Sequence, residues 1–409
     1  MVDSESPTAS VCILGAGPHG LSMALHLQRA DPTLASRMVV IDPSGDWMTT
    51  WESNFRRLDI DVLRSPSVHH PGPDVDGLSS FVHENGLPTS HLPYDVPRSD
   101  PFMAFCRELV DTNPIPRPVA GRPTAIRPHA AGVGVEVGGR MITAERLIVA
   151  TNPHRRELPR WIVPILGRTR VDIRHADDID LPSGGDLAGR TIVVVGGGLS
   201  AGHLACGAAS LGADVTLVSR RPLTERSFDT DPGWLGPKYL RDYDLVAAPE
   251  DRLAQARAAR GGGTMPGWML TRIRNHAQAG TIRLCEGDPI EVAEAADTTC
   301  RLILRSGSSV EADGIWLATG TTPDLRALRA LEPVLPDIAT VDGLPVPDDG
   351  LRIGRHPIHV MGRLAMLRLG PASGNLWGAR VAARRITTAI TGVEVQTMSK
   401  AERRRFSQR

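Results

Sequence analysis

Residues 11–20 read Val-Cys-Ile-Leu-Gly-Ala-Gly-Pro-His-Gly, and this stretch decides the fold that the sequence predicts. Its first four residues are an apolar run with the length of a buried strand, and the run meets a glycine-rich turn. Leucines at helical spacing follow over residues 21–27, and a second apolar run, Met38–Ile41, ends at Asp42. A strand, a glycine turn, a helix and a strand in this order predict a parallel βαβ unit.

The glycine turn has the spacing Gly-x-Gly-x-x-Gly, in which each glycine has a physical task. Gly15 makes the tight turn, Gly17 lets the backbone approach a pyrophosphate, and Gly20 lets helix and strand pack closely. Pro18 opens the helix, whose N-terminal N–H groups attract phosphate. Asp42 stands where a carboxylate accepts hydrogen bonds from ribose hydroxyls, which predicts an adenine dinucleotide with a free ribose, FAD. The alternative for Asp42 is a cap on the turn before Pro43.

The same order of elements occurs a second time, from residue 191 to residue 221. The strand Thr191–Val195 meets Gly-Gly-Gly-Leu-Ser-Ala, a helix is expected over 202–211, and the strand Asp214–Val218 follows. The residues expected to hold a dinucleotide at this turn are Gly196, Gly198, Ser200 and Ala201.

The second copy differs from the first where the acid should stand, because Ser219, Arg220 and Arg221 follow its second strand. Arginine binds phosphate with two parallel hydrogen bonds, and a missing carboxylate removes repulsion from a 2′-phosphate. These residues predict a preference for NADPH over NADH. Two arginines on a solvated strand end are the alternative.

A further pattern repeats in both halves and suggests the domain organisation. A hairpin over 133–143 runs into Leu147–Asn152, and a hairpin over 302–312 runs into Ile315–Gly320, both ending in Ala-Thr. Thr319 and Gly320, at the end of the second of these strands, are expected to belong to the NADPH site. Proline-rich stretches mark the joins. We predict an α/β protein with two Rossmann-like dinucleotide-binding domains: a discontinuous FAD domain over 1–155 and 317–409, and an inserted NADPH domain over 156–316.

Composition excludes several classes of function. The chain has 409 residues with 46 Lys and Arg against 46 Asp and Glu, so its balanced charge does not favour nucleic-acid binding. No apolar run is long enough to span a membrane. The polar residues 1–10 do not resemble a signal peptide, and the five cysteines are scattered without a Cys-x-x-Cys pair, as expected for a cytoplasmic protein.

Two histidine pairs, His69-His70 and His356-x-x-His359, lack carboxylates at ligand spacing, so no metal site is predicted. The stretch 46–120 shows no clean hydrophobic period, and we expect a long irregular excursion there.

These motifs, together with Ala318-Thr-Gly320, resemble the single-component FAD- and NADPH-dependent flavin monooxygenases, and within them the N-hydroxylating branch of ornithine and lysine N-hydroxylases. The resemblance covers nearly the whole chain. Leu369-Gly-Pro371, followed by Asn375 and Leu376, is similar to the helix whose N-terminus meets the flavin ring in this family. Ser227–Trp234 is similar to the substrate-facing loop of the family.

The resemblance implies that NADPH reduces FAD, that O2 adds to the reduced ring, and that a flavin hydroperoxide passes one oxygen to a nucleophile. It implies a catalytic set of polar side chains and further residues around the flavin. The alternatives are that the aromatic residues belong to the core and that the Asp and Arg side chains form a pair that only fixes the loop. The expected catalytic residues are Asp59, Asp61, Arg64 and Asn375, and the further FAD contacts are Trp47, Trp51, Gly362, Pro371 and Leu376.

The substrate implied is a small nucleophile, most simply an amine nitrogen of an amino acid or related metabolite. The family carries a lysine that holds an amino-acid substrate, but Arg57–Arg64 contains none, which puts ornithine in doubt. Baeyer–Villiger or S-oxygenation, a non-oxygenating NADPH-dependent flavoprotein oxidoreductase and a slow sensor flavoprotein stay open, as does a homo-oligomer. Beyond O2 and a small molecule no partner is predicted.

Overall fold

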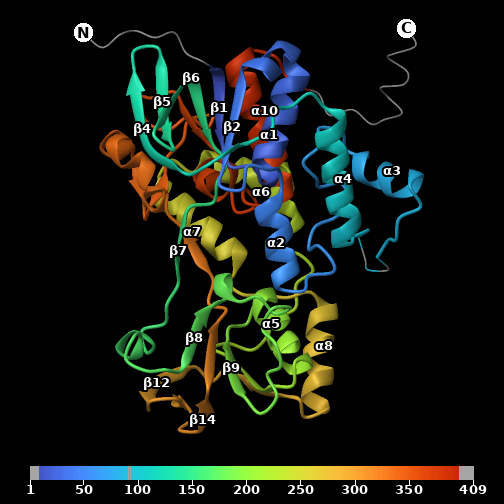
Figure 1. Ribbon diagram of the computed structural model, residues 1–409, viewed down its shortest axis with the longest axis vertical. Coiled ribbons are helices and arrows are strands. Elements are labelled where there is room, and N and C mark those ends of the chain that lie inside the picture. The colour runs from blue at the N-terminus through green and yellow to red at the C-terminus, as the bar shows by residue number, and fades with distance from the viewer. Residues whose placement is uncertain (1–8, 91, 93, 396–409) are drawn as a thin grey trace.

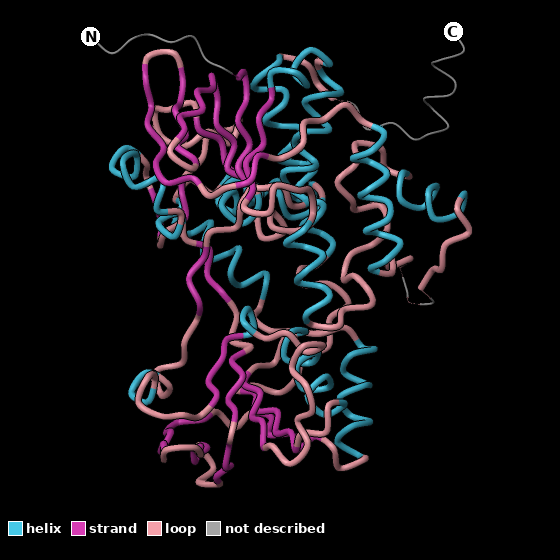
Figure 2. The backbone as a smooth tube through the Cα atoms, viewed as in Figure 1, coloured by secondary structure: helices cyan, strands magenta, loops and turns pink. Residues whose placement is uncertain are grey.

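The computed structural model describes residues 9–395 except residues 91 and 93, so most of the polar N-terminal stretch lies outside the described residues. The chain forms two lobes, each built around its own sheet, and they are stacked along the longest axis (Figure 1). The tube in Figure 2 shows one group of strands in each lobe with helices beside it, and further strand segments that run between the lobes.

The first lobe contains a seven-stranded sheet in the order β3-β2-β1-β6-β5-β4, with β19 also paired to β6. The strands β3, β2, β1, β6 and β19 run parallel, whereas β5 and β4 are antiparallel to their neighbours. The bounds are β1 Ala9–Leu14, β2 Met38–Asp42, β3 Val119–Ala120, β4 Pro123–His129, β5 Gly132–Val137, β6 Arg140–Val149 and β19 Ile358–Val360.

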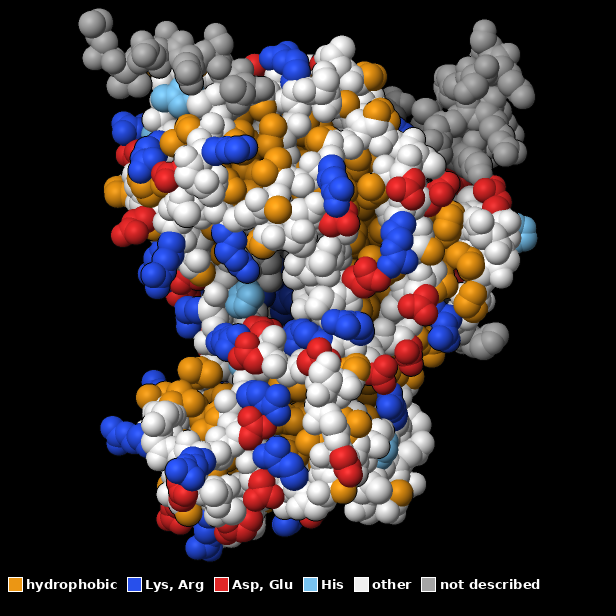
Figure 3. Space-filling model, in the orientation of Figure 1, with side chains coloured by type: hydrophobic (Ala, Val, Ile, Leu, Met, Phe, Trp, Pro, Cys, Tyr) orange, Lys and Arg blue, Asp and Glu red, His pale blue; other side chains and the backbone are white. Residues whose placement is uncertain are grey.

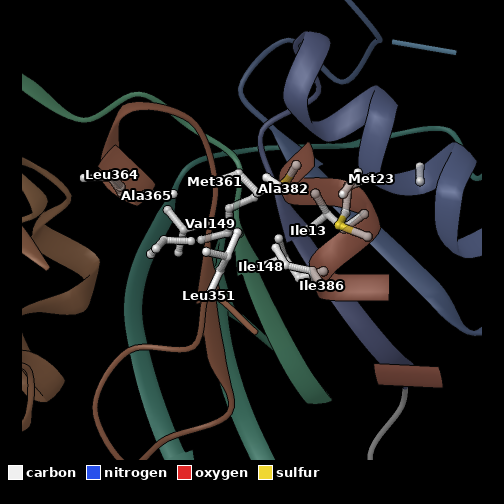
Figure 4. Close-up of a cluster of buried hydrophobic side chains, with 14 of the residues drawn as sticks. Ile13, Met23, Ile148, Val149, Leu351, Met361, Leu364, Ala365, Ala382 and Ile386 are labelled. Atoms are coloured by element: carbon white, nitrogen blue, oxygen red, sulfur yellow. The ribbon is translucent and has the colours of Figure 1, made fainter. Parts of the chain in front are cut away.

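Two helices, α1 (Pro18–Ala30) and α10 (Leu376–Thr391), pack against this sheet and against each other. Figure 4 shows how their apolar side chains meet those of the strands: Ile13 of β1 and Ile148 of β6 lie beside Met23 of α1 and Ile386 of α10. All four side chains are fully buried. Burial of each contributes about 1.5–3 kcal/mol, so this layer fixes the position of the glycine turn between β1 and α1.

The stretch 46–120 contains three helices, which the sequence analysis did not predict. They are α2 (Thr49–Arg57), α3 (Gly77–Glu84) and α4 (Ser99–Thr112). The helices α2 and α3 have only nine and eight residues, too few for a helical period to be recognised, whereas the sequence analysis missed the 14-residue α4 although its length is sufficient. Phe102 and Phe105 of α4 are buried in the core of the first lobe and anchor the excursion there.

The second lobe has a five-stranded parallel sheet in the order β11-β10-β9-β15-β8 and a small antiparallel sheet β12-β13-β14. The helices α5 (Leu199–Ser210) and α8 (Gly267–Gln278) share its core. The strand bounds are β8 Asp172–His175, β9 Thr191–Val195, β10 Asp214–Ser219, β11 Ile282–Glu286, β12 Ile290–Ala295, β13 Cys300–Leu304, β14 Ser309–Ala312 and β15 Gly314–Leu317.

The repeated hairpins differ between the lobes. In the first lobe β6 is one continuous strand, which forms the hairpin with β5 and also pairs with β1. In the second lobe the corresponding chain is split into β14 and β15 at Asp313, whose Oδ2 accepts a hydrogen bond from Thr191 N at 2.9 Å. The predicted hairpins are present in both lobes, but only the first belongs to the main sheet.

The lobes are joined by the antiparallel pair of β7 (His154–Arg156) and β16 (Thr321–Pro323). Two further helices, α6 (Pro237–Leu245) and α7 (Pro249–Arg260), follow the strand β10 of the second lobe but pack into the core of the first. The Tyr243 hydroxyl donates to Met366 O at 2.8 Å, next to α9 (Met366–Leu369). The remaining strands, β17 (Thr340–Val341) and β18 (Leu344–Pro345), pair with each other.

The predicted fold class, α/β with two Rossmann-like units, is confirmed by the two sheets and their glycine turns. Membership of the sheets follows the predicted division of the chain, whereas α6 and α7 fall inside the predicted range 156–316 and yet share the core of the first lobe. The domain boundaries stay a prediction. Within the described residues, no helix combines the length and hydropathy needed to cross a membrane.

Candidate dinucleotide-binding site

The first glycine turn has the geometry of a phosphate site. Gly15 has φ +102°, a conformation that favours glycine, and a Cβ on Gly20 would overlap Gly15 O. A Cβ on Gly17 would meet nothing within 4 Å, so the backbone there is open to a ligand. Gly17 is the N-cap of α1, no side chain caps the helix, and Pro18 occupies the first turn. The free N–H groups and the helix dipole therefore point toward the open space.

Asp42 lies at the end of β2 and is buried beside this turn. Its Oδ2 accepts a hydrogen bond from Ala16 N at 3.0 Å, and its Oδ1 accepts from Ser44 N at 2.9 Å and Ser44 Oγ at 2.6 Å. The carboxylate thus holds the glycine turn and also caps the next turn, as the alternative interpretation expected. A carboxylate has about four lone-pair sites, so three donors leave capacity for a ribose hydroxyl.

The N-terminus of α10 lies next to the N-terminus of α1. The His19 Nε2 of α1 is 3.3 Å from Ser373 O, just before the N-cap Asn375 and the first helical residue Leu376. Gly362, with φ +65°, lies against the same histidine, because a Cβ there would be 3.4 Å from Nε2. Burial lowers the pKa of His19, which favours the neutral ring. Two helix dipoles add their positive ends at one place.

Several buried polar atoms around these helix ends have no protein partner: Thr151 Oγ1, Ser373 Oγ and Arg363 Nε. Thr151 lies beside Gly15, since a Cβ on the glycine would be 3.0 Å from Cγ2. Arg363 donates to Thr321 through its other nitrogens, and desolvation together with Arg260 lowers its pKa to about 10. Buried polar groups rarely lack partners, so this cradle of orphaned atoms and helix N-termini fits an anionic, hydrogen-bonding ligand such as FAD.

Trp47 and Trp51 pack within the protein. Trp47 is buried and its Nε1 donates to Pro116 O at 3.1 Å. Trp51 stacks on Phe55 with ring centroids 4.5 Å apart and also contacts Phe102, while its Nε1 has no partner. The observed contacts are those of core aromatics, and a role at the flavin stays a prediction.

The second glycine turn repeats the first in its backbone. Gly196 has φ +154°, Gly198 is the N-cap of α5, and no side chain caps this helix. Ser200 lies in the first turn, and Ala201 is fully buried where the first copy has its third glycine.

Arg220 and Arg221 are exposed after β10, as the sequence predicts. The buried Ser219 hydroxyl is instead turned inward and donates to Arg221 O at 2.5 Å. An acid that the sequence analysis missed, Glu286, ends β11 in register with Ser219 and accepts from Leu223 N at 2.9 Å. Glu286 is far from β10 in the sequence, so only the parallel pairing of β10 and β11 shows that it lies beside Ser219.

The predicted catalytic residues have contacts of three different kinds. Asp59 has φ +52° and Asp61 O accepts a hydrogen bond from Ser99 N, and both side chains are exposed. Arg64 reaches the second lobe, where it donates to Arg226 O at 2.8 Å, Ser227 O at 3.3 Å and Thr264 O at 3.0 Å. The contacts of Arg64 are thus inter-lobe contacts, and a catalytic role for this set stays a prediction.

Asn375 lies at the centre of a network that the sequence analysis missed in part. Its Nδ2 donates to Asp229 Oδ1 at 3.0 Å, and Asp229 Oδ2 accepts from Arg260 Nη2 at 2.9 Å. Arg260 also donates to Pro371 O at 2.9 Å. The segment Ser227–Trp234 therefore contacts the N-terminus of α10, next to the cradle. The sequence feature that could have indicated this contact was the similarity of Ser227–Trp234 to the substrate-facing loop of the family.

Thr319 and Gly320 lie at the linker strands. The Thr319 hydroxyl donates to Glu157 O, and Gly320 O accepts from Glu157 N at 3.0 Å. His175 Nε2 lies 3.2 Å from the same carbonyl. These contacts position the linker, and a role in NADPH binding stays a prediction.

The two histidine pairs have protein partners: His70 with Val75 O, His69 with Ser65, His356 with Asp337 and His359 with Gly350 O. In the part of the chain that the structure describes, no three His, Cys, Asp or Glu side chains are grouped as metal ligands.

The surface of the molecule is hollowed between the two lobes, where basic side chains and one histidine are visible in Figure 3. A separate groove of about 580 Å³ runs along α10, lined by Arg368, Arg384, Arg385 and Asp349 among others. The glycine turns do not line this groove.

A family model for the pyridine nucleotide-disulphide oxidoreductases matches residues 12–250. This range includes both glycine turns and the residues between them. A search of the curated proteins finds no match to this sequence.

Solved structures share the fold at low sequence identity. The cadaverine monooxygenase DfoA from Erwinia amylovora, solved with FAD, has 15% identity and a TM-score of 0.75, with 97% of each chain covered. The ornithine N-hydroxylase KtzI from Kutzneria sp. 744 has 17% identity and a TM-score of 0.75, covering 98% of this chain and 100% of that one. The bacillithiol disulfide reductase Bdr from Staphylococcus aureus has 15% identity and a TM-score of 0.62, covering 94% and 99%. The predicted resemblance to two-domain flavin monooxygenases is thus confirmed for the fold.

Proposed function

Because the chain belongs to the pyridine nucleotide-disulphide oxidoreductase family, we propose that it is an NADPH-dependent flavin monooxygenase. It binds FAD at the first glycine turn and NADPH at the second, and it uses O2 to hydroxylate a small nucleophilic substrate. The observation that carries this proposal is the pair of unlike glycine turns, one followed by Asp42 and the other by Arg220 and Arg221.

In the FAD site, the turn at Gly15 and Gly17 lets the pyrophosphate approach the N-terminus of α1, whose free N–H groups donate to it, and Asp42 accepts from the ribose. Leu376, at the start of α10, offers a free N–H toward the flavin ring, and Arg363 adds a positive charge. Bound FAD supplies the hydride acceptor and the centre for O2 chemistry. The first lobe orients it, and closure of the recess by the second lobe excludes water.

In the NADPH site, the exposed Arg220 and Arg221 bind the 2′-phosphate. A charged hydrogen bond contributes about 1.5–3 kcal/mol, so removing one guanidinium should weaken NADPH about tenfold to hundredfold. Arg220→Ala should therefore raise the KM for NADPH and leave that for NADH nearly unchanged. Steady-state kinetics with both nucleotides measure this, with the exposed Arg241→Ala as control. Equal effects of Arg220→Ala on both nucleotides would contradict the proposed role.

The substrate proposed is an amine nitrogen of an amino acid or related metabolite. Support comes from the fold shared with a cadaverine monooxygenase and an ornithine N-hydroxylase. The segment Arg57–Arg64 has no lysine, so we expect an amine without the amino-acid carboxylate to be preferred over ornithine. Oxygenation at sulfur or a Baeyer–Villiger reaction is an alternative outcome of the same chemistry.

Disulfide reduction is a second candidate, because the fold is also shared with bacillithiol disulfide reductase. The cysteines do not support it: all five are free, and only Cys285 is not buried. Free buried cysteines agree with a location in the reducing cytoplasm, which we also propose.

Rapid mixing of the NADPH-reduced protein with O2 separates the two candidates. A monooxygenase should give a transient absorbance distinct from both oxidised and reduced flavin, which an amine substrate then shortens. Direct return to the oxidised spectrum, without hydroxylated product in a panel of amines, would refute the monooxygenase.

A further inference from the structure

The two glycine turns are copies of one motif, and Gly17 and Gly198, the second glycine of each, are both half-buried. They differ in what lies beside them. A Cβ on Gly17 would meet nothing within 4 Å, whereas a Cβ on Gly198 would lie 3.3 Å from Gly263 Cα and 4.0 Å from Thr264 N. The second glycine of this motif is the place where the backbone approaches the pyrophosphate. At the second turn, the backbone of Gly263 lies against that side of the glycine.

The covering segment is Gly261–Thr264, which we call the glycine cover. Seen from its own side the contact is equally close: Gly263 has no side chain, and a Cβ added to it would lie 2.8 Å from Gly198 N and 3.1 Å from Gly198 Cα. A ligand that approaches Gly198 from this side would meet the backbone of Gly263.

Arg64 of the first lobe holds the glycine cover in place. Its Nη1 donates to Thr264 O at 3.0 Å, and its Nη2 donates to Thr264 Oγ1 at 2.8 Å and to Arg226 O at 2.8 Å. Met265, next to the cover, pairs with the segment 224–226 that Arg64 also contacts: Arg226 N donates to Met265 O, and Met265 N donates to Thr224 O. The guanidinium of Arg64 thus joins the cover to the first lobe.

The cover also engages one of the arginines assigned to NADPH. The Arg221 Nη2 lies against Gly262, where a Cβ would overlap it. Gly261 and Gly262 have φ +64° and +83°, which favour glycine. Because glycine adopts many backbone conformations, three successive glycines allow the segment to change conformation at a small cost in free energy. Release of the cover would free Arg221 at the same time as it exposes Gly198.

We propose that the glycine cover closes the NADPH site and that Arg64 is the positioning residue that latches it. The inference rests on the proposed NADPH binding at the second turn. NADPH must displace Gly263 from Gly198, so its observed affinity is reduced by the fraction of molecules that are closed. A nucleotide with a 2′-phosphate draws Arg221 from Gly262 and opens the cover, whereas NADH lacks that contact.

The test is the affinity of the FAD-loaded full chain for NADP+, measured by calorimetric titration. Arg64→Ala should tighten NADP+ binding about tenfold, the loss of a charged hydrogen bond that favours the closed state. A merely structural role would not improve binding. Arg64→Lys, which keeps the charge but not the fork, should give an intermediate gain.

A matched control is Arg57→Ala. Arg57 also crosses between the lobes, donating to Ala176 O and to Ile179 O at 2.9 Å, but it does not touch the cover. Its NADP+ affinity should match the unaltered protein. Equal tightening in both variants would assign the effect to lobe opening and overturn the latch, and weaker binding in Arg64→Ala would also overturn it.

Hydrogen exchange gives a second readout that separates the inference from the proposed function. Addition of NADP+ to the unaltered protein should slow exchange at 196–201 and speed it at 264–265, where Thr264 is buried and Met265 N donates to Thr224 O. If NADP+ neither binds nor protects 196–201, the proposed NADPH site fails. If it protects 196–201 without speeding exchange at 264–265, the site stands and the glycine cover is refuted.

Discussion

At the scale of single residues, the glycines of one motif have separable tasks. Gly20 is required by packing, because its Cα faces Gly15 O with no room for a side chain. Gly17 has φ −79° and open space around it, so the fold itself would tolerate a side chain at this position. We therefore attribute the glycine at position 17 to the proposed approach of the pyrophosphate rather than to packing.

Gly17→Val should leave the protein folded but unable to bind flavin. Valine fits the extended backbone and open space, so the unfolding temperature of apoprotein should change by no more than about 2 °C. Its side chain fills the place of the pyrophosphate, and flavin absorbance per chain should fall to near zero. Gly20→Val is the comparison, since its overlap should destabilise the apoprotein by about 1–3 kcal/mol. A fully yellow Gly17→Val protein would show that FAD binds elsewhere.

At the scale of elements, the linker strands carry a titratable contact. His154 of β7 lies with its Nε2 3.4 Å from Asp177 Oδ2, and Asp177 also contacts His175 and Arg156. The hydrogen bond to Asp177 raises the pKa of His154, although burial and, more weakly, Arg363 oppose this. Hydrogen bonds from His154 and His175 hold the pKa of Asp177 well below its usual range.

The stability of the protein should therefore depend on pH through His154. The contact with Asp177 is fully present below the ordinary histidine pKa of 6.5 and is lost as the pH rises through the raised value. On the acid side it is lost as the pH falls below the ordinary aspartate pKa of 3.8. His154→Gln should lower the unfolding temperature by at most about 2 °C near pH 5.5 and by nothing at pH 9.

Unfolding temperatures across this pH range measure the effect. The exposed His129→Gln variant serves as the control. A difference that grows toward alkaline pH would have the wrong sign for this contact.

At the scale of the whole molecule, the lobes are joined by more than their linker strands. The helices α6 and α7 follow the second lobe in sequence but pack into the core of the first. In the opposite direction, Arg64 of the first lobe donates a hydrogen bond to Thr264 O of the second. The recess between the lobes is therefore enclosed by elements from both, which suits a reaction that must exclude water. Four of the five cysteines are buried and Cys285 is half-buried. Burial raises the pKa of Cys12 to about 12 and of Cys206 to about 11, so these thiols are not activated.

NADPH should therefore reduce the flavin of this protein without generating new thiols. Thiol-reagent counts on the native chain should be the same before and after anaerobic addition of NADPH, with Cys285 the first to react, because it alone is half-buried. Two additional reactive thiols per chain after NADPH would identify a disulfide reductase and remove the monooxygenase proposal. Cys285→Ser should retain NADPH oxidation.

The sequence by itself determined the strands, the glycine turns and their duplication. These features are local: an apolar run, a Gly-x-Gly and a following helix lie within 30 residues, and the turn needs those residue types wherever it occurs. The same locality distinguished Asp42 from Arg220, on which the proposal of two different nucleotides rests. The helices of the stretch 46–120 and the helices α6, α7 and α8 were not predicted, and of these α2 and α3 are too short to show a helical period.

Tertiary structure alone decided how the two units meet. Arg64 and Thr264 are 200 positions apart, and Asn375 and Asp229 are 146 apart, so no periodicity or spacing joins them. The approach of Gly263 to Gly198 is likewise a contact between backbones, which leaves no pattern of side chains to read. Local sequence predicts each proposed nucleotide site, whereas the contact that we propose covers the second is made by chain packing that only the folded molecule reveals.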